Sequence, residues 1–329
     1  MTEILMNVRD LVVDYGGGAD RLRAVDSVSF SLYRGETFAV IGESGSGKTS
    51  LAHALAGIVK PAAGSIDRVP GANGRTAGRS HVIFQDPRSA LDPRLAVWQC
   101  VAEPMAPRRL RIPRSTRPAA VELLRRVGLG EELADRKPAQ LSGGQRQRVT
   151  IARAVASRAE LILCDEPVAS LDVSLQSEVL ALLAELRDEH GLTYVFISHD
   201  LGSVARIADR VGVMYMGRLV ELGPTASVLE SPRHPYTQAL LAAVPRPTRV
   251  RRERRGLLLR GEIPDRRNPP SGCRFRTRCH LATDRCATTA PALTDDTESH
   301  SAACHFRQEA IEAWQSALGP AADRKEESR

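Results

Sequence analysis

The residues Gly42-Glu43-Ser44-Gly45-Ser46-Gly47-Lys48-Thr49 fit the phosphate-binding pattern G-x-x-x-x-G-K-[ST]. Before this loop, the apolar run 36–41 predicts a buried strand, and the apolar residues at helical spacing after it predict a helix that ends near Gly57. The glycines allow backbone N–H groups to point inward, and the helix adds the positive end of its dipole. We therefore expect a polyphosphate here, with Lys48 between its outer two phosphates and Thr49 ligating Mg²⁺.

The composition indicates a folded chain with more than one domain. Its 329 residues exceed the size at which a single core stops growing, so one large and one smaller domain are expected. Hydrophobic residues make up 42% and charged residues 26%, as in ordinary globular proteins. No apolar run approaches the length of a membrane span, and residues 1–7 lack the features of a signal peptide, so a cytosolic location is expected.

The chain is basic, with a net charge of +7 and a pI near 9.4. The excess charge lies in two arginine-rich stretches, 108–117 and 246–260, and not along a recognisable nucleic-acid-reading element. A specific nucleic-acid partner is therefore not expected. Each stretch is interpreted as a solvated surface or linker, with contact to a membrane surface as the alternative.

Two further polar residues, one before and one after the phosphate loop in the sequence, are candidates for contacts at the nucleotide site. Tyr15 precedes the glycine cluster 16–18, and its ring is a candidate stacking platform for a nucleotide base; the alternative is that it packs within a sheet. Gln85 follows the apolar run 81–84, where its amide can reach Mg²⁺ or an attacking water. The Gln85 pattern alone assigns no role.

A helical segment with a second anion-binding pattern interrupts the strands. Prolines punctuate residues 88–140, where strand patterns vanish, so an inserted helical subdomain is predicted. Leu141-Ser142-Gly143-Gly144-Gln145 then opens a helix that runs to about residue 156. Ser142 can cap this helix, and Gly143 and Gly144 offer bare N–H groups to an anion, which predicts a second phosphate contact that includes Gln145.

Acidic and basic side chains follow two more predicted strands. The apolar run 161–164 ends in Asp165 and Glu166, where Asp165 is placed to hold Mg²⁺ and Glu166 to polarise a water that attacks a γ-phosphate. The run 193–197 precedes His199, whose imidazole can donate to the same phosphate.

These motifs, in this order, resemble the ATP-binding subunits of ABC transporters over nearly the whole chain. Residues 42–49 match Walker A, 141–145 match the LSGGQ signature and 161–165 match Walker B. The resemblance implies an ABC ATPase core of the P-loop α/β class, ATP with Mg²⁺ as cofactors, and Gln85 and His199 as γ-phosphate sensors beside the catalytic base Glu166. It implies Mg²⁺ contacts from Thr49, Gln85 and Asp165. The expected nucleotide contacts are Tyr15 (the A-loop), Gly42, Glu43, Ser44, Gly45, Ser46, Gly47, Lys48, Thr49, Ser50, Ser142, Gly143, Gly144, Gln145 and the D-loop Asp172.

A narrower resemblance is to the oligopeptide and dipeptide importer branch. It rests on residues 84–94, on His234-Pro235-Tyr236-Thr237 and on the spaced cysteines of the C-terminal segment. It implies a motor on the cytoplasmic face of the cell membrane, with two permease subunits and an extracytoplasmic solute-binding protein. The family pairs two such domains head to tail, with ATP clamped between them. The short connection 64–84 and Arg94 are similar to the second of two ATPase types, so a heterodimer is expected.

The expected domain organisation follows from these matches. Residues 1–233 form the nucleotide-binding domain with a β-rich N-terminal layer and a helical subdomain at about 88–158, residues 234–310 form a small cysteine-containing extension, and residues 311–329 form a disordered tail. Four cysteines, Cys273, Cys279, Cys286 and Cys304, lie in the extension. Four thiolates can hold zinc or an iron–sulfur cluster, and free thiols are the third alternative. The resemblance favours a [4Fe–4S] cluster.

Two classes of function fit the sequence. The first is an ATP-driven importer of peptides or a related small solute, whose cargo is selected by other subunits. The second is a soluble ABC ATPase that acts on nucleic acid or ribosomes. The single ATPase domain and the lack of a basic region interleaved with aromatic residues favour the importer.

Overall fold

The structure is a computed structural model that describes residues 3–70, 80–106, 111–244, 257, 261–297 and 299–318. Most of the arginine-rich stretch 246–260, together with Arg108, Arg109 and residues 319–329 of the predicted tail, lies outside the described residues.

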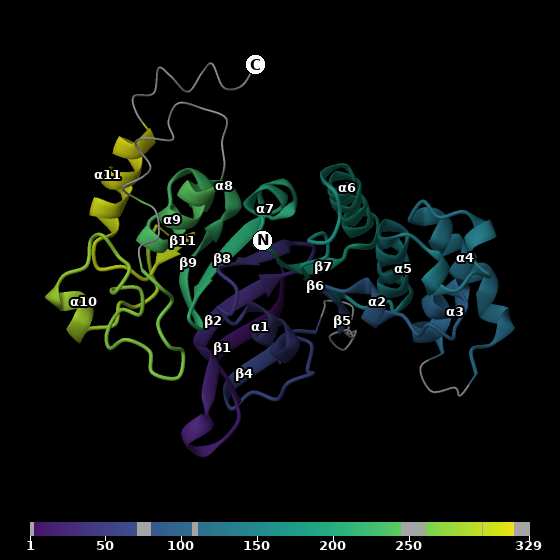
Figure 1. The fold of residues 1–329 in the computed structure, drawn as a ribbon, viewed down its shortest axis with the longest axis horizontal. Helices are drawn as coiled ribbons and strands as arrows, with labels where there is room; N and C mark the ends of the chain where they lie inside the picture. Colours follow the sequence, from purple (N-terminus) through teal and green to yellow (C-terminus); the bar gives the residue numbers. More distant parts are fainter. Residues whose placement is uncertain are drawn as a thin grey trace.

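The described residues alternate between strands and helices along the chain (Figure 1). The strands are β1 Ile4–Tyr15, β2 Leu22–Tyr33, β3 Thr37–Ile41, β4 Ala63–Arg68, β5 Ser80–Ile83, β6 Leu161–Asp165, β7 Thr193–Ile197, β8 Arg210–Tyr215, β9 Arg218–Pro224, β10 Thr294–Thr297 and β11 His300–Ala302. The helices are α1 Lys48–Leu55, α2 Pro87–Ala90, α3 Val97–Ala102, α4 Arg117–Arg126, α5 Gly143–Ala156, α6 Val173–His190, α7 Leu201–Ile207, α8 Thr225–Glu230, α9 Pro235–Ala243, α10 Asp284–Thr288 and α11 Arg307–Leu318. Short 3₁₀ turns lie at Gly18–Asp20, Glu103–Met105, Arg114–Thr116, Glu131–Leu133 and Pro138–Gln140.

A mixed sheet forms the centre of the molecule, with the strand order β10-β11-β9-β8-β3-β7-β6-β5. The five strands from β8 to β5 in that order pair in parallel, and antiparallel pairing begins between β8 and β9. Both faces of the parallel part are covered by other elements, so all five residues of β3, β6 and β7 are buried, whereas only Ile83 is buried in the edge strand β5. The predicted α/β fold class is confirmed.

Two apolar cores lie on opposite faces of this sheet. Alternate residues of β3 show the division, because Phe38 and Val40 belong to one core and Ala39 and Ile41 to the other. The first core is closed by α1 and by the antiparallel sheet β2-β1-β4, which is the predicted β-rich N-terminal layer. The second core runs under α3, α4, α5 and α6.

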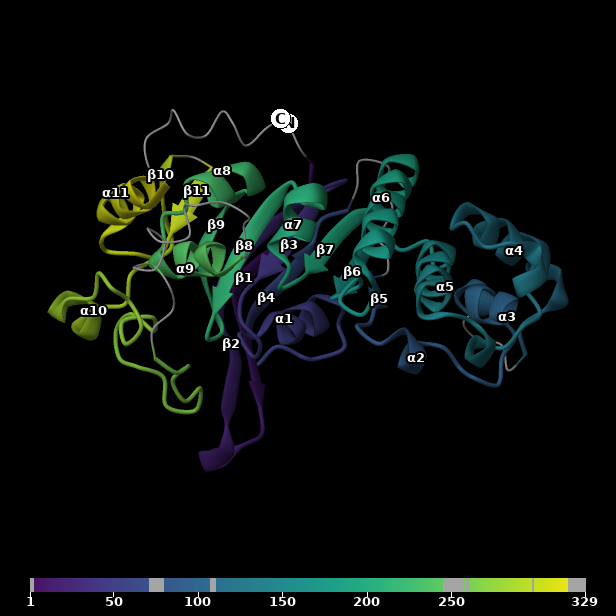
Figure 2. The same cartoon turned by 45° about the horizontal axis from the view of Figure 1, so that its top comes forward.

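The inserted segment forms a separate helical lobe, as predicted. Both views place α3, α4 and α5 at one end of the molecule and α10 and α11 at the other, with the central sheet between them (Figure 1, Figure 2). No helix in the described part of the chain is both long and apolar enough to cross a bilayer.

The C-terminal extension is joined to the central sheet. β11 pairs with β9, with Ser301 opposite Leu222 and Ala302 opposite Glu221. The fully buried Glu221 accepts hydrogen bonds from the backbone N–H groups of Arg233 and His234 and lies 2.8 Å from Nε2 of His300. Because a buried carboxylate needs several partners, this residue holds together segments on both sides of the predicted boundary at 233/234.

The predicted start of a disordered tail at residue 311 is wrong, because α11 extends to Leu318. Ala310, Trp314 and Ala317 recur at helical spacing and are buried, and Nε1 of Trp314 donates to the carbonyl of Glu230 at 2.9 Å. The charged residues around this apolar stripe made the composition of the segment similar to that of the tail. The helical spacing of its apolar residues, however, is typical of a helix that packs against a core.

We expect Trp314→Ala to lower the free energy of unfolding by about 3–5 kcal/mol, since it removes a buried indole and its hydrogen bond. The matched control is Gln315→Ala, which changes an exposed residue of the same helix and is expected to cost less than about 0.5 kcal/mol. Urea unfolding followed by circular dichroism measures both. Equal stability of the two variants would show that α11 does not dock through Trp314.

Candidate functional site

The predicted site residues gather at one edge of the central sheet. The parallel strands β3, β5, β6 and β7 all point the same way, so their carboxyl ends meet at this edge. The phosphate loop follows β3, Gln85 follows β5, Asp165 and Glu166 lie at the end of β6, and His199 follows β7. Topology therefore brings together side chains that are separated by more than a hundred residues in the sequence.

The phosphate loop takes a backbone path that only glycine allows at two positions. Gly42 and Gly47 have φ angles of +151° and +109°. A Cβ at Gly42 would lie 2.2 Å from the carbonyl oxygen of Met214, and one at Gly47 would lie 2.2 Å from that of Ala24. Larger residues are excluded by both conformation and space, so the loop is held tightly between β8 and β2.

Lys48 is held inside the loop. Its side chain is buried, and its Nζ donates to the carbonyls of Gly42 at 2.8 Å and Glu43 at 2.9 Å. Burial lowers the pKa of Lys48, and the carboxylates Glu166, Asp165 and Glu43 oppose that shift. The ammonium group is therefore fixed where the first turn of α1 also directs its free N–H groups.

Thr49 and Asp165 form a pair suited to a hard cation. The hydroxyl of Thr49 lies 3.4 Å from Oδ1 of Asp165. Burial raises the pKa of Asp165, and the hydrogen bond from Thr49 acts in the opposite direction. Oxygen donors in this arrangement fit the chemistry of Mg²⁺.

Gln85, Glu166 and His199 form one hydrogen-bonded group. Nε2 of Gln85 donates to Oε2 of Glu166 at 2.9 Å, and Nδ1 of His199 lies 3.1 Å from Oε1 of the same carboxylate. The carboxylate is therefore bound from two sides by the residues predicted as phosphate sensors. The arrangement can orient a water molecule and accept its proton.

Glu166 also has an unusual backbone conformation, with φ at +49°. Its N–H donates to the carbonyl of Ile197 on β7 at 3.0 Å, which fixes the turn after β6. A non-glycine residue in this region is strained, and such strain is common where a side chain must be aimed at a reaction. No pattern in the sequence indicated this backbone conformation.

The second predicted anion site is a capped helix start. Oγ of Ser142 accepts from the N–H of Gln145 at 3.2 Å, and Oε1 of Gln145 accepts from the N–H of Ser142 at 2.9 Å. A Cβ at Gly144 would lie 3.2 Å from Leu175, so this glycine permits close packing on α6, while Gly143 is exposed. Both views show α5 apart from α1, so the structure does not bring this site to the phosphate loop of the same chain (Figure 1, Figure 2).

Two other predicted contacts lie at the surface. Asp172 caps α6, since its Oδ1 accepts from the N–H of Leu175 at 3.0 Å and from the hydroxyl of Ser174 at 2.7 Å. These hydrogen bonds lower its pKa. Tyr15 ends β1, where it pairs with Leu22 of β2, and 39% of its surface is exposed. An exposed ring at this position is available to stack on a base.

Residues of the extension contact the phosphate loop, which the sequence did not predict. Arg278 makes a two-pronged ion pair with Glu43, with distances of 2.6 and 3.1 Å, and the phenolic oxygen of Tyr236 accepts from the N–H of Glu43 at 2.8 Å. The bond to Glu43 raises the pKa of Arg278. These partners lie 193 and 235 residues from Glu43, which is why local patterns gave no signal.

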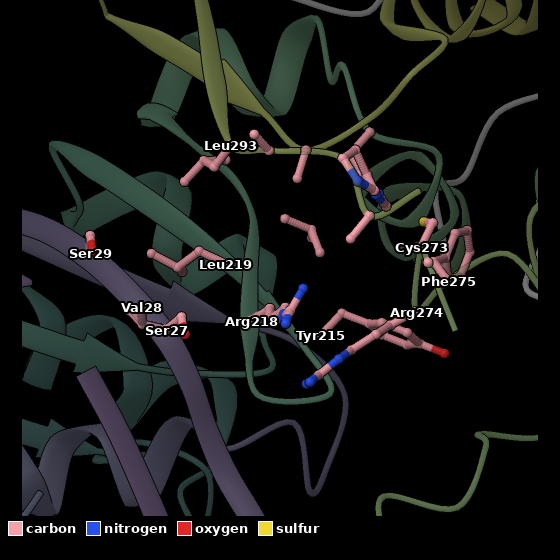
Figure 3. A pocket seen from close by; sticks show the side chains of 17 residues that line it. Ser27, Val28, Ser29, Tyr215, Arg218, Leu219, Cys273, Arg274, Phe275 and Leu293 are labelled. Atoms are coloured by element: carbon pink, nitrogen blue, oxygen red, sulfur yellow. The ribbon is translucent and has the colours of Figure 1, made fainter. Parts of the chain in front are cut away.

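A cavity of about 360 Å³ lies where the extension meets β2 and the β8–β9 hairpin (Figure 3). Tyr215 and Phe275 stand on one side, with ring centroids 5.3 Å apart, and Leu219 and Leu293 on another. The guanidinium of Arg274 is held below them by the buried carboxylate of Asp26. The extension is thus anchored to the nucleotide-binding core by aromatic packing and by ion pairs.

The four cysteines of the extension influence one another. Burial raises the pKa of Cys304 to about 12 and that of Cys279 to about 11, with smaller contributions from the neighbouring thiols of Cys273 and Cys286. Among the described residues, however, no group of three or more His, Cys, Asp or Glu side chains is arranged to hold a metal ion. The predicted [4Fe–4S] cluster is therefore not supported by this geometry.

Comparison with known families gives two matches along the chain. The family described as "ABC transporter" matches residues 25–169, and the family described as "Oligopeptide/dipeptide transporter, C-terminal region" matches residues 220–286. The first covers the phosphate loop and the acids at the end of β6, and the second covers most of β9 and three of the four cysteines of the extension.

Curated relatives are similar over most of their length. The chain is 45% identical to the probable peptide ABC transporter ATP-binding protein y4tS of Sinorhizobium fredii, over 89% of this chain and 85% of the relative. It is 43% identical to the oligopeptide transport ATP-binding protein AppF of Bacillus subtilis, over 87% of this chain and 90% of the relative.

Solved structures of ATP-binding cassettes share the fold. The cassette MJ0796, solved as a dimer in a post-hydrolysis state bound to ADP and Pi, matches with a TM-score of 0.59 and 27% identity over 67% of this chain and 98% of that one. The cassette cbiO1 of Clostridium perfringens matches with a TM-score of 0.59 and 30% identity over 69% of this chain and 91% of that one. Together with the site geometry, these matches show that the chain is an ATPase and belongs to the ATP-binding subunits of ABC transporters, in the oligopeptide/dipeptide branch.

Proposed function

We propose that this chain drives the uptake of peptides, or of a related small solute, by binding and hydrolysing ATP beneath a pair of membrane permeases. The observation that carries the proposal is the match of its extension to the oligopeptide/dipeptide family, in a chain whose relatives are named for peptide transport. The extension contacts the phosphate loop through Arg278 and Tyr236, so the family-specific part of the chain is connected to the ATP site.

Within this proposal, each residue at the sheet edge has a distinct role in ATP binding or hydrolysis. The loop 42–50 binds the phosphates, with Lys48 supplying a fixed positive charge, and the ring of Tyr15 stacks on the base. Thr49, Asp165 and Gln85 would hold Mg²⁺, which would neutralise charge on the outer phosphates. Glu166 orients the attacking water and accepts its proton, and its hydrogen bonds to Gln85 and His199 support this role.

The site is completed by a second subunit in this proposal. Ser142, Gly143, Gly144 and Gln145 lie on α5, apart from α1, so they are free to contact ATP held by a partner subunit, with Asp172 at the same interface. The dimeric state of MJ0796 supports such pairing. We propose a second ATPase subunit of the other type as the partner, two permeases, and an extracytoplasmic solute-binding protein that selects the cargo. The location would be the cytoplasmic face of the membrane.

Two assignments stay as proposals of finer detail. We retain the domain boundary at 233/234, although β11 and β9 share a sheet across it, and we extend the second domain beyond residue 310 to Leu318, where α11 ends. The cysteines hold a [4Fe–4S] cluster, zinc or no metal, and the cluster rests on family resemblance alone. Iron, sulfide and zinc analysis of anaerobically purified protein distinguishes these alternatives, and no step of the mechanism above depends on the outcome.

Glu166→Gln tests the catalytic assignment. We expect ATP binding to be retained, kcat to fall by at least about 100-fold, and an ATP-dependent dimer to accumulate, because the amide cannot accept the proton of water. Glu185→Gln, which changes an exposed glutamate on α6, is the matched control and is expected to keep the wild-type rate. Phosphate release and size-exclusion chromatography with ATP give the readouts. Wild-type turnover in Glu166→Gln would remove this residue from its role.

Co-purification tests the transport assignment. The tagged chain, recovered from detergent-solubilised membranes of its native host, is expected to bring with it two multi-span permeases and a second ATPase. The control is the untagged host carried through the same procedure. Recovery of ribosomes or other cytosolic partners, without membrane subunits, would contradict the importer and support the soluble ATPase.

A further inference from the structure

Arg266 of the extension lies against the phosphate loop. It stands in a tight turn in which the N–H of Asn268 donates to the carbonyl of Asp265 and the N–H of Arg267 donates to Oδ1 of the same aspartate. Nη1 of Arg266 lies 3.4 Å from the place that a Cβ on Gly45 would occupy. The turn therefore brings a guanidinium to the middle of the phosphate loop.

No hydrogen bond or ion pair of this guanidinium is found among the residues that the structure describes. Its Nε and Nη2 atoms are buried, and neither has a hydrogen bond within the described part of the chain. Burial lowers the pKa of Arg266. A cation in this position is costly unless an anion meets it.

The other arginines of the extension that reach the core differ in this respect. Arg274 is paired with Asp26, and Arg278 is paired with Glu43, the acid of the phosphate loop itself. Glu43 is thus already engaged from two sides by Arg278 and Lys48, since Lys48 binds its carbonyl and Arg278 its carboxylate. Arg266 is left facing the loop without a charged partner from it.

The positive charges of Arg266 and Lys48 both lie at the phosphate loop. Burial is the main cause that lowers the pKa of Lys48, and the charge of Arg266 adds to that shift, while the three carboxylates around Lys48 oppose it. An anion bound at the loop would offset the free-energy cost of burying both positive charges. The anion that an ATPase brings to this loop is the polyphosphate of its nucleotide, and guanidinium groups bind phosphate oxygens with paired, charge-assisted hydrogen bonds.

We propose that Arg266 is a further phosphate-binding residue, which donates hydrogen bonds from the extension to the outer phosphates of the ATP held by residues 42–49. The extension then contributes directly to nucleotide affinity. The free energy of the extension also differs between the nucleotide-free and nucleotide-bound states. The turn that holds Arg266 carries an unpaired charge without nucleotide and a paired charge with it. This assignment rests on ATP binding at the loop and not on the identity of the transported solute.

The first test compares Arg266→Gln with Arg267→Gln in the full-length chain. Arg267 is exposed in the same turn, so its variant controls for loss of one positive charge from this segment. Calorimetric titration with a non-hydrolysable ATP analogue and Mg²⁺ is expected to give a Kd raised about tenfold or more for Arg266→Gln, as for loss of a charged hydrogen bond. Arg267→Gln is expected to stay within about twofold of wild type. A Kd within the same limit for Arg266→Gln would overturn the proposal.

Thermal unfolding separates phosphate binding from a structural role. Without nucleotide, Arg266→Gln is expected to unfold at the wild-type Tm or above it, because the substitution removes an unpaired charge. The rise in Tm on adding the analogue is expected to be smaller than in wild type. Arg266→Lys, which keeps the charge but not the fork of donors, is expected to recover part of that rise. An equal fall in Tm with and without the analogue would show a structural role and overturn the proposal.

Discussion

The close approach of the phosphate loop to its neighbours is the constraint on which the site depends. At Gly42 and Gly47 no side chain fits, because the carbonyls of Met214 and Ala24 stand where a Cβ would be. The loop is therefore clamped between the end of β8 and the N-terminal sheet. The buried Lys48 closes it from inside by binding two of its carbonyls. A loop held in this way keeps its N–H groups directed at a ligand before the ligand arrives, which reduces the cost of binding.

The parallel sheet extends this preorganisation to the groups that we propose act on the bound phosphate. The direction of β3, β5, β6 and β7 alone brings Thr49, Gln85, Glu166 and His199 to one edge. The strained backbone of Glu166 then turns its carboxylate toward Gln85 and His199. Movement of the segments after β5 and β7 would change the contacts of this carboxylate. Hydrolysis can thereby be sensitive to the position of the helical lobe, which continues from the segment that carries Gln85.

Much of this arrangement was predictable because it is local. A few consecutive residues are enough to indicate each of three features: the strand, loop and helix around residues 36–57, the acids after 161–164, and the capped helix at Ser142. The docking of α11 and the pairing of β11 with β9 were not predictable, since they depend on contacts between distant segments. The same holds for Arg266, which lies against Gly45, and for Arg278 and Tyr236, which bind Glu43, because each is about 200 residues away from the loop in the sequence. For the cysteines, spacing alone left three chemistries open, and the described geometry supplies no ligand set for a metal ion.

The central claim is that each chain carries two half-sites, a phosphate loop for its own ATP and a Ser142 helix start for the ATP of its partner. The most direct measurement is the ATP affinity of the isolated chain at concentrations where it is monomeric, together with the ATPase rate of the assembled complex, for Ser142→Arg and Lys48→Ala. The account predicts that Ser142→Arg leaves the monomer's affinity unchanged and abolishes the rate of the site that its helix completes, whereas Lys48→Ala weakens the affinity itself. An equal loss of monomer affinity in both variants would contradict the division into half-sites.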